Sequence, residues 1–279
     1  MQTIYSFSEL RAVRASMRGS FGLIPTMGAL HVGHASLVER ARQECNYIGT
    51  SIFVNPTQFG VGEDFGKYPR TLEKDLVLLE SLGADIVFAP RVDAIYPPGY
   101  QTWVDVADVT APLEGKYRPG HFRGVTTVVA KLLNAFTPSK AYFGQKDAQQ
   151  VVVLKRMVRD LSFPVELMVC PTVREADGLA MSSRNAYLLP AERQAATVLY
   201  RSLCAAKEKY DGGERNGEML RAAMQSMLDR EPLAATQYVS AADPETLGEL
   251  DRIEKGVLLS LAVQIGKTRL IDNFLIGDQ

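Results

Sequence analysis

Short runs of β-branched and aromatic residues alternate with segments of helical periodicity through the first 175 or so residues of this chain. In the first such pair, the run FGLIPT precedes a segment in which Leu37, Val38 and Ala41 fall on one helical face. Strands that alternate with helices imply right-handed crossovers and a parallel sheet covered on both faces. The chain is therefore predicted to be an α/β protein in which residues 1–175 form a Rossmann-like, doubly wound parallel sheet. Strands are expected at 21–26, 47–54, 85–90, 102–106, 140–144 and 164–171, and helices at 33–44, 70–83, 124–136 and 147–160.

The pattern changes after residue 175. Two alanine-rich helical segments, 190–213 and 217–230, are followed by strand-like runs at 236–243, 256–265 and 268–276. Helices followed by consecutive strands indicate a separate, smaller α+β domain. We expect this domain to span 176–279 and to close over a nucleotide site in the first one.

Charge and composition narrow the function classes. A net charge of −1 and a pI of about 6.3 do not suggest a bulk nucleic-acid binder or a membrane-surface protein. The N-terminal segment is charged where a signal peptide would need an apolar stretch, and the longest nearly apolar run is too short to span a bilayer. The three cysteines are widely spaced and form no CxxC pair, so we expect reduced thiols in a cytoplasmic protein.

The segment PTMGALHVGH follows the first strand of the alternating pattern, where doubly wound sheets bind their ligands. His31 and His34 lie three residues apart, so they share one face if a helix begins near residue 32. Glycines at 28 and 33 would let a planar base or a phosphate approach the backbone, and a helix N-terminus favours phosphate. The alternatives are a plain glycine-rich turn with surface histidines, or a zinc pair for which no third ligand is nearby.

Two further segments suit a phosphorylated ligand. In FGQKDAQQ, Lys146 lies near a predicted helix N-terminus, which is unfavourable for a cation unless an anion binds there. Asp147 could cap that helix or hold a ribose hydroxyl. In MSSRN, two hydroxyls and a guanidinium in consecutive positions could grip phosphate oxygens, although a polar loop is the simpler alternative.

Three other segments remain open between two interpretations. Carboxamides in FVNPTQFG could fix a small polar ligand, or the segment could be a turn stiffened by proline. Asp75 could bind a metal or lie on a solvated helix face. The basic segment 116–124 could be a flap over the site or a subunit contact.

The motifs PTMGALHVGH, FVNPTQFG, YPRTLEKD, RPGHFRGV, FGQKDAQQ and READGLAMSSRN occur in this order between about residues 20 and 190. HxGH with a later Ser-Ser-Arg loop resembles the HIGH and KMSKS pair of the nucleotidyltransferase superfamily. The full set is similar to the pantoate–β-alanine ligase (pantothenate synthetase) family. The resemblance implies a two-step, ATP- and Mg²⁺-dependent condensation through pantoyl adenylate, in a homodimer without nucleic-acid or membrane partners.

The resemblance also implies roles for individual residues. His34 would be the proton donor, with His31 and Lys146 on the phosphates, and Gln58 and Gln150 would bind pantoate. No metal ligand can be assigned, and Gln145 departs from the glutamate that is common in the family. The implied ATP-binding residues are Met27, Gly28, Ala29, Leu30, His31, Val32, Gly33, His34, Gly144, Gln145, Lys146, Asp147, Val173, Met181, Ser182, Ser183 and Arg184.

Two other function classes fit part of the pattern. A nucleotidyltransferase that leaves the nucleotide on its product would also carry HxGH and a late Ser/Arg loop, but it would not need two glutamines for a hydroxy acid. A nucleotide-binding regulatory module would not need both imidazoles together with Lys146.

Overall fold

The computed structural model describes residues 1–277, which fold into two compact units. The first unit comprises Met1–Gly144 and Val153–Cys170, and the second comprises Gln145–Val152 and the chain from Pro171 onward. Residues 145–152 therefore group with the C-terminal part of the chain. The predicted domain limits at 175 and 176 stay a prediction.

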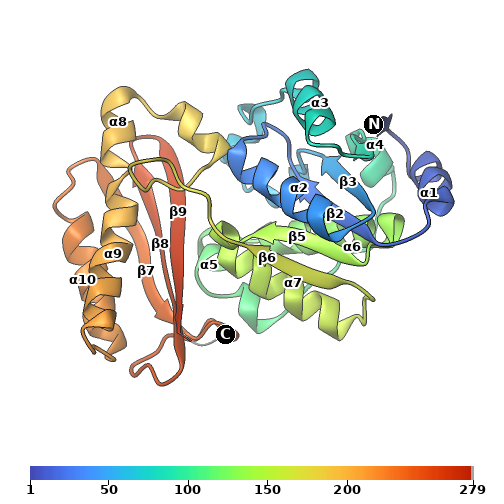
Figure 1. Ribbon diagram of the computed structural model, residues 1–279. Coiled ribbons are helices and arrows are strands. Elements are labelled where there is room, and N and C mark those ends of the chain that lie inside the picture. Colours follow the sequence, from blue (N-terminus) through green and yellow to red (C-terminus); the bar gives the residue numbers. More distant parts are fainter. Residues whose placement is uncertain (278–279) are drawn as a thin grey trace. The chain divides into compact units, whose positions relative to one another are not determined.

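A parallel six-stranded sheet forms the centre of the first unit (Figure 1). The strand order is β1–β4–β3–β2–β5–β6. From β2 the chain therefore adds β3 and then β4 on one side, and it returns to add β5 on the opposite side of β2. This is the predicted doubly wound topology, and its switch point lies between β2 and β5. The strands are β1 (Gln2–Ile4), β2 (Phe21–Thr26), β3 (Tyr47–Ile52), β4 (Ile86–Phe88), β5 (Lys140–Gly144) and β6 (Glu166–Cys170).

Helices pack on both faces of this sheet. The predicted apolar face of α2 is buried against Ile24 and Ile48, together with residues of α3. On the other side α6 packs against α1, and its Phe136 ring lies 5.8 Å from that of Phe21. The helices are α1 (Phe7–Ser16), α2 (Val32–Glu44), α3 (Leu72–Ser81), α4 (Val92–Ile95), α5 (Glu114–Tyr117), α6 (His121–Phe136) and α7 (Ala148–Asp160). Short 3₁₀ turns lie at η1 (Pro56–Gln58), η2 (Asp64–Gly66), η3 (Asp108–Thr110) and η4 (Gln145–Asp147).

The prediction of a strand at 102–106 is wrong, because this part of the described chain pairs with no strand. The backbone groups of Val104 are used by α6 instead. Its N–H donates to Thr127 Oγ1 at 3.0 Å, and its carbonyl accepts from Thr126 Oγ1 at 2.6 Å. The segment is therefore tied to a helix and not to a sheet.

The second unit contains the predicted helices and antiparallel strands, with one correction. The segment 190–213 forms two helices, because at their junction the N–H groups of Thr197 and Leu199 donate to carbonyls three residues back (3.3 and 3.2 Å) in place of four. The hairpin between β8 and β9 turns at Gly266, whose φ of +55° lies in the left-handed region. The elements are η5 (Ser183–Tyr187), α8 (Pro190–Ala195), α9 (Val198–Asp211), α10 (Gly217–Leu228), β7 (Ala234–Ala242), β8 (Gly256–Ile265) and β9 (Thr268–Gly277).

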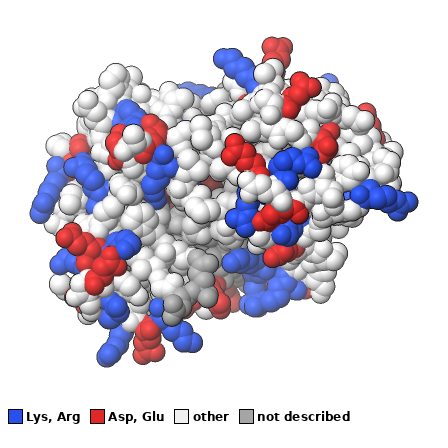
Figure 2. All heavy atoms as spheres, viewed as in Figure 1, with Lys and Arg blue, Asp and Glu red and all other residues white. Residues whose placement is uncertain are grey.

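The surface carries charges of both signs. On the face in Figure 2, basic and acidic side chains alternate without a continuous patch of one sign. Within residues 1–277, no helix is both long enough and apolar enough to cross a bilayer.

Candidate active site

The turn that joins β2 to α2 has a constrained backbone. Gly28 and Ala29 both adopt left-handed conformations, with φ of +85° and +51°. This conformation is costly for alanine and easy for glycine. The helix begins at Val32, as predicted, so His31 is its N-cap residue and His34 lies in its first turn.

The two imidazoles satisfy backbone donors at the start of α2. His31 Nδ1 accepts from the Gly33 N–H at 3.1 Å, and His34 Nδ1 accepts from the His31 N–H at 3.3 Å. This reciprocal arrangement resembles a capping box. Because each Nδ1 accepts a hydrogen bond, the proton of each neutral ring lies on Nε2. Both half-buried rings, whose centroids are 4.1 Å apart, can therefore act as Nε2–H donors at a helix N-terminus.

The opposite tautomer is fixed at His121. Its Nε2 lies 3.2 Å from Arg118 Nη1, which can only donate, and its Nδ1 lies 2.8 Å from the Gln58 carbonyl, which can only accept. Neutral His121 must therefore carry its proton on Nδ1.

The chain has three histidines, so ¹⁵N-histidine labelling reports on all of these rings. We expect two imidazoles in the Nε2–H form and one in the Nδ1–H form in two-bond ¹H–¹⁵N spectra recorded where the rings are neutral. The variant His121→Asn should remove the Nδ1–H pattern and leave the other two unchanged. Three Nε2–H patterns in the unmodified protein would contradict this description.

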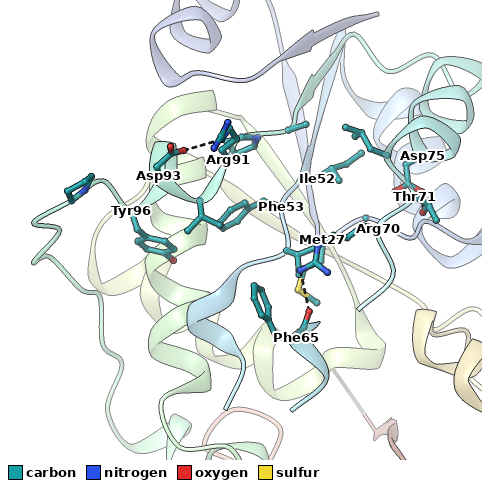
Figure 3. Close-up of a pocket in the computed structure, with 17 residues that line it drawn as sticks. Met27, Ile52, Phe53, Phe65, Arg70, Thr71, Asp75, Arg91, Asp93 and Tyr96 are labelled. Atoms are coloured by element: carbon teal, nitrogen blue, oxygen red, sulfur yellow. Dashed lines mark hydrogen bonds and ion pairs between the residues drawn. The ribbon is translucent and has the colours of Figure 1, made fainter. Parts of the chain in front are cut away.

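Asp75 does not lie on a solvated helix face. It is 3% exposed, and its two oxygens accept from the N–H groups of Ala29 and Leu30, each at 2.9 Å. Thr71 Oγ1 also donates to Asp75 Oδ1 at 3.1 Å. Figure 3 shows Thr71 and Asp75 next to each other at the start of α3. The spacing of residues along the predicted helix did not indicate these contacts, because Ala29 and Leu30 lie 46 and 45 positions before Asp75 in the chain.

Gln58 lies in the turn after β3. Its Oε1 accepts from Asn55 Nδ2 at 3.2 Å, and its Nε2 lies 3.0 Å from the Met27 sulfur. The buried Asn55 also donates to the Gly124 carbonyl at 3.1 Å. The carboxamide of Gln58 is thereby held beside the histidine turn of the same unit.

The basic segment 116–124 contributes internal contacts. Arg118 forms a bidentate pair with Glu63 at 2.7 and 2.8 Å, and it also donates to the Gln58 carbonyl at 3.3 Å. Burial raises the pKa of Glu63, but the guanidinium outweighs burial and holds that pKa below its ordinary value. Arg118 and His121 therefore anchor the turn that carries Gln58.

Stability should depend on pH through His121. Burial, and then the charge of Arg118, lowers the pKa of His121 from 6.5 to about 4. Between these values the unfolded chain binds more protons than the folded one, so folding weakens as pH falls. We expect urea unfolding to give a free energy about 2 kcal/mol lower at pH 5 than at pH 7 from this group. The variant His121→Asn should be less stable at pH 7 but should lack this loss of unfolding free energy between pH 7 and pH 5. An equal dependence of the unfolding free energy on pH in both proteins would refute the role of His121.

Lys146 and Asp147 lie in the second unit, in the 3₁₀ turn before α7. Lys146 Nζ is 3.8 Å from Asp147 Oδ1, and the lysine side chain is 21% exposed. Asn273 of β9 holds the backbone here, because its Nδ2 donates to the carbonyls of Gln145 and Lys146 at 3.0 and 2.8 Å. The Gln145 side chain donates to Asn273 Oδ1 at 3.0 Å, so the amide at this position is used within the unit.

The Ser-Ser-Arg segment is braced by acidic residues of the same unit. Ser182 caps η5 by accepting from the Arg184 N–H at 3.3 Å. Asn185 donates to Glu175 Oε1 at 3.0 Å, and Glu175 in turn pairs with Arg193 at 2.6 Å. These contacts fix the backbone from which the two serines and Arg184 project.

The implied site residues thus divide between the two units. The first unit holds the histidine turn, Gln58 and Gly144, and the second holds the remaining residues. In the second unit, the Val173 carbonyl accepts from the Met181 N–H at 3.0 Å, which joins two of the segments that the resemblance implies for ATP binding. The implied site residues in the second unit are Gln145, Lys146, Asp147, Gln150, Val173, Met181, Ser182, Ser183 and Arg184.

A cavity of about 760 Å³ lies at the carboxyl ends of β2, β3 and β4 (Figure 3). Met27 and Gly28 of the histidine turn line it, together with Asp75. Phe53 and Tyr96 supply apolar walls. This volume is typical of a small-molecule site. Among residues 1–277, no group of three or more His, Cys, Asp or Glu side chains could hold a metal ion.

Comparisons with known proteins identify the family of this chain. The Pantoate-beta-alanine ligase family model matches residues 2–275. A pantothenate synthetase of Roseiflexus castenholzii is 60% identical over 276 residues, with 99% of each chain covered. A solved pantothenate synthetase from Thermus thermophilus superimposes with a TM-score of 0.95 at 48% identity, covering 98% of this chain and 99% of that one. A pantoate-beta-alanine ligase from Francisella tularensis, complexed with beta-gamma ATP and beta-alanine, has a TM-score of 0.81 at 36% identity and covers 99% and 97%.

Proposed function

This chain belongs to the pantoate-beta-alanine ligase family, and from that premise we propose that it condenses pantoate with β-alanine to pantothenate, converting ATP to AMP and pyrophosphate. The observation that carries the proposal is the pair of Nε2–H imidazoles at the N-terminus of α2. Such donors suit charge that develops on phosphate oxygens during transfer.

The first step forms an acyl adenylate. A carboxylate oxygen of pantoate bonds to the α-phosphorus of ATP, the bond from that phosphorus to the α–β bridging oxygen breaks, and pyrophosphate leaves with the electron pair. His34 donates a hydrogen bond from its Nε2–H to an oxygen of the departing pyrophosphate, and His31 and Lys146 stabilise phosphate charge. Asp147 binds the ribose, and Ser182, Ser183 and Arg184 bind phosphate oxygens.

The second step forms the amide. The amine nitrogen of β-alanine bonds to the carbonyl carbon of pantoyl adenylate, the bond from that carbon to the AMP oxygen breaks, AMP leaves with the electron pair, and the nitrogen loses a proton to solvent. Gln58 and Gln150 hold pantoate through both steps by hydrogen bonds from their carboxamides. The fixed position of Gln58, between Asn55 and Met27, supports this assignment.

Mg²⁺ enters as the MgATP complex. This ion usually keeps several water ligands and binds substrate phosphates. Both oxygens of Asp75 already accept backbone hydrogen bonds. This supports phosphate oxygens and water molecules as the main ligands of Mg²⁺.

The proposal includes a homodimer in the cytoplasm. The resemblance to the family supports the dimer, and three free cysteines support a reducing compartment.

Product analysis tests the proposed function. Purified protein is mixed with MgATP, pantoate and β-alanine, and each component is omitted in turn. We expect AMP release that requires both organic substrates, and pantoate-dependent exchange of labelled pyrophosphate into ATP without β-alanine. A stable adenylylated product, or ADP instead of AMP, would refute the proposal.

A further inference from the structure

We infer that Asp75 is a positioning residue for adenylate formation, because its buried carboxylate holds the turn that carries His31 and His34. The inference rests on the proposed function. It concerns a residue that touches neither imidazole in the contacts described above and acts through the backbone of residues 27–31.

The carboxylate is matched to two consecutive backbone donors. Asp75 Oδ2 accepts from Ala29 N–H and Oδ1 from Leu30 N–H, both at 2.9 Å, the short distance typical of a charge-assisted bond. A carboxylate that is 3% exposed needs such donors to offset the loss of water. The Thr71 hydroxyl adds a third donor, and the first turn of α3 supplies a favourable dipole.

These bonds select one conformation of the turn. Ala29 is held at a φ of +51°, which alanine rarely adopts without external support. Two residues further on, the N–H of His31 donates to His34 Nδ1. Three successive N–H groups, at 29, 30 and 31, therefore have defined acceptors, and the last of them orients the imidazole assigned as proton donor.

The turn also has little room to shift toward Asp75. A Cβ added at Gly28 would lie 3.1 Å from Asp75 Oδ2 and 3.0 Å from Ile52 Cγ2. An acid one methylene longer would have to displace the turn to keep its hydrogen bonds. Charge and geometry can therefore be tested separately at this position.

The variant Asp75→Asn tests the inference. Its amide nitrogen cannot accept, so one of the two backbone bonds is lost while the volume is kept. We expect the maximal rate of pantoate-dependent pyrophosphate exchange per folded molecule to fall roughly 10²-fold, because catalysis tolerates misplacement poorly. The KM for ATP should change by less than about 3-fold, since the loss concerns the transition state. In ¹⁵N-histidine spectra, His34 should lose its fixed Nε2–H pattern.

Asp85→Asn is the matched control. The Asp85 carboxylate likewise accepts a backbone N–H, from Ile48 at 2.7 Å, but at the amino ends of the strands. We expect it to lower stability and leave the maximal exchange rate and the His34 spectrum unchanged. Thr71→Val, which keeps both backbone bonds, should lower the rate less than about 3-fold.

Asp75→Glu covers the case in which the asparagine variant does not fold. It keeps the charge, so we expect a folded protein with a maximal rate at least about 10-fold lower. Full activity of Asp75→Asn or of Asp75→Glu, or an equal loss in Asp85→Asn, would overturn the inference. Failure of the proposed function would instead leave the unmodified protein without pyrophosphate exchange.

Discussion

Replacing His34 by alanine is expected to lower the rate of pyrophosphate exchange by about 10²-fold or more, the usual loss when a preorganised donor to a developing charge is removed. The Nδ1 atom of His34 accepts from His31 N–H, so the neutral ring carries its proton on Nε2 and can donate a hydrogen bond to a phosphate oxygen. Rapid-quench measurement of adenylate formation, with folded protein verified by circular dichroism, checks this effect. The fold should persist, because His34 is half-buried at the surface of α2.

His34→Gln separates the two functions of this side chain. Glutamine at the third helical position can accept from the N-cap N–H, as in a capping box. It should therefore preserve the start of α2 but lose the imidazole donor, and its rate should be close to that of His34→Ala. Near-normal turnover in either variant would remove His34 from the mechanism.

Replacing Lys146 by alanine should reduce adenylate formation by a similar factor, about 10²-fold. The ammonium lies just before α7, and its ion pair with Asp147 is long, at 3.8 Å, and therefore weak. A phosphate bound there would favour both the lysine and the helix N-terminus. Single-turnover kinetics at saturating ATP measure the loss.

Lys155→Ala provides the control for Lys146. This lysine lies on α7, the helix that follows the Lys146 turn, and is exposed, so its removal should leave the rate unchanged. If Lys146→Ala also retained the full rate, the side chain would be a solvated surface residue and not a phosphate ligand.

Most of the fold could be predicted because its signal is local. The spacing of Leu37, Val38 and Ala41 predicts the buried face of α2, and alternation of strands and helices predicts the parallel sheet. β1 has three residues and no usable period, and α1 was missed although Ser6 and Glu9 have the spacing of a capping box. The run at 102–106 has strand-like residues, but threonines of α6 take its hydrogen bonds.

The candidate site was predictable where chemistry follows directly after a strand. The histidine turn follows β2, and the Lys146 turn follows β5. The groups that hold these turns were not predictable, since they come from distant segments. Asp75 is identified by two backbone contacts, Asn273 by its bonds to residues 145 and 146, and His121 by its contact with Gln58. A single sequence carries no periodic signal for such pairings.

In the proposed reaction, this chain transfers the AMP group of ATP to the carboxylate of pantoate before the amide forms. Pantoate with both carboxylate oxygens replaced by ¹⁸O tests it most directly, with products of the complete reaction analysed by mass spectrometry. We expect one ¹⁸O in the phosphate of AMP, one in the amide carbonyl of pantothenate, and none in pyrophosphate. AMP without ¹⁸O, or label in pyrophosphate, would contradict it.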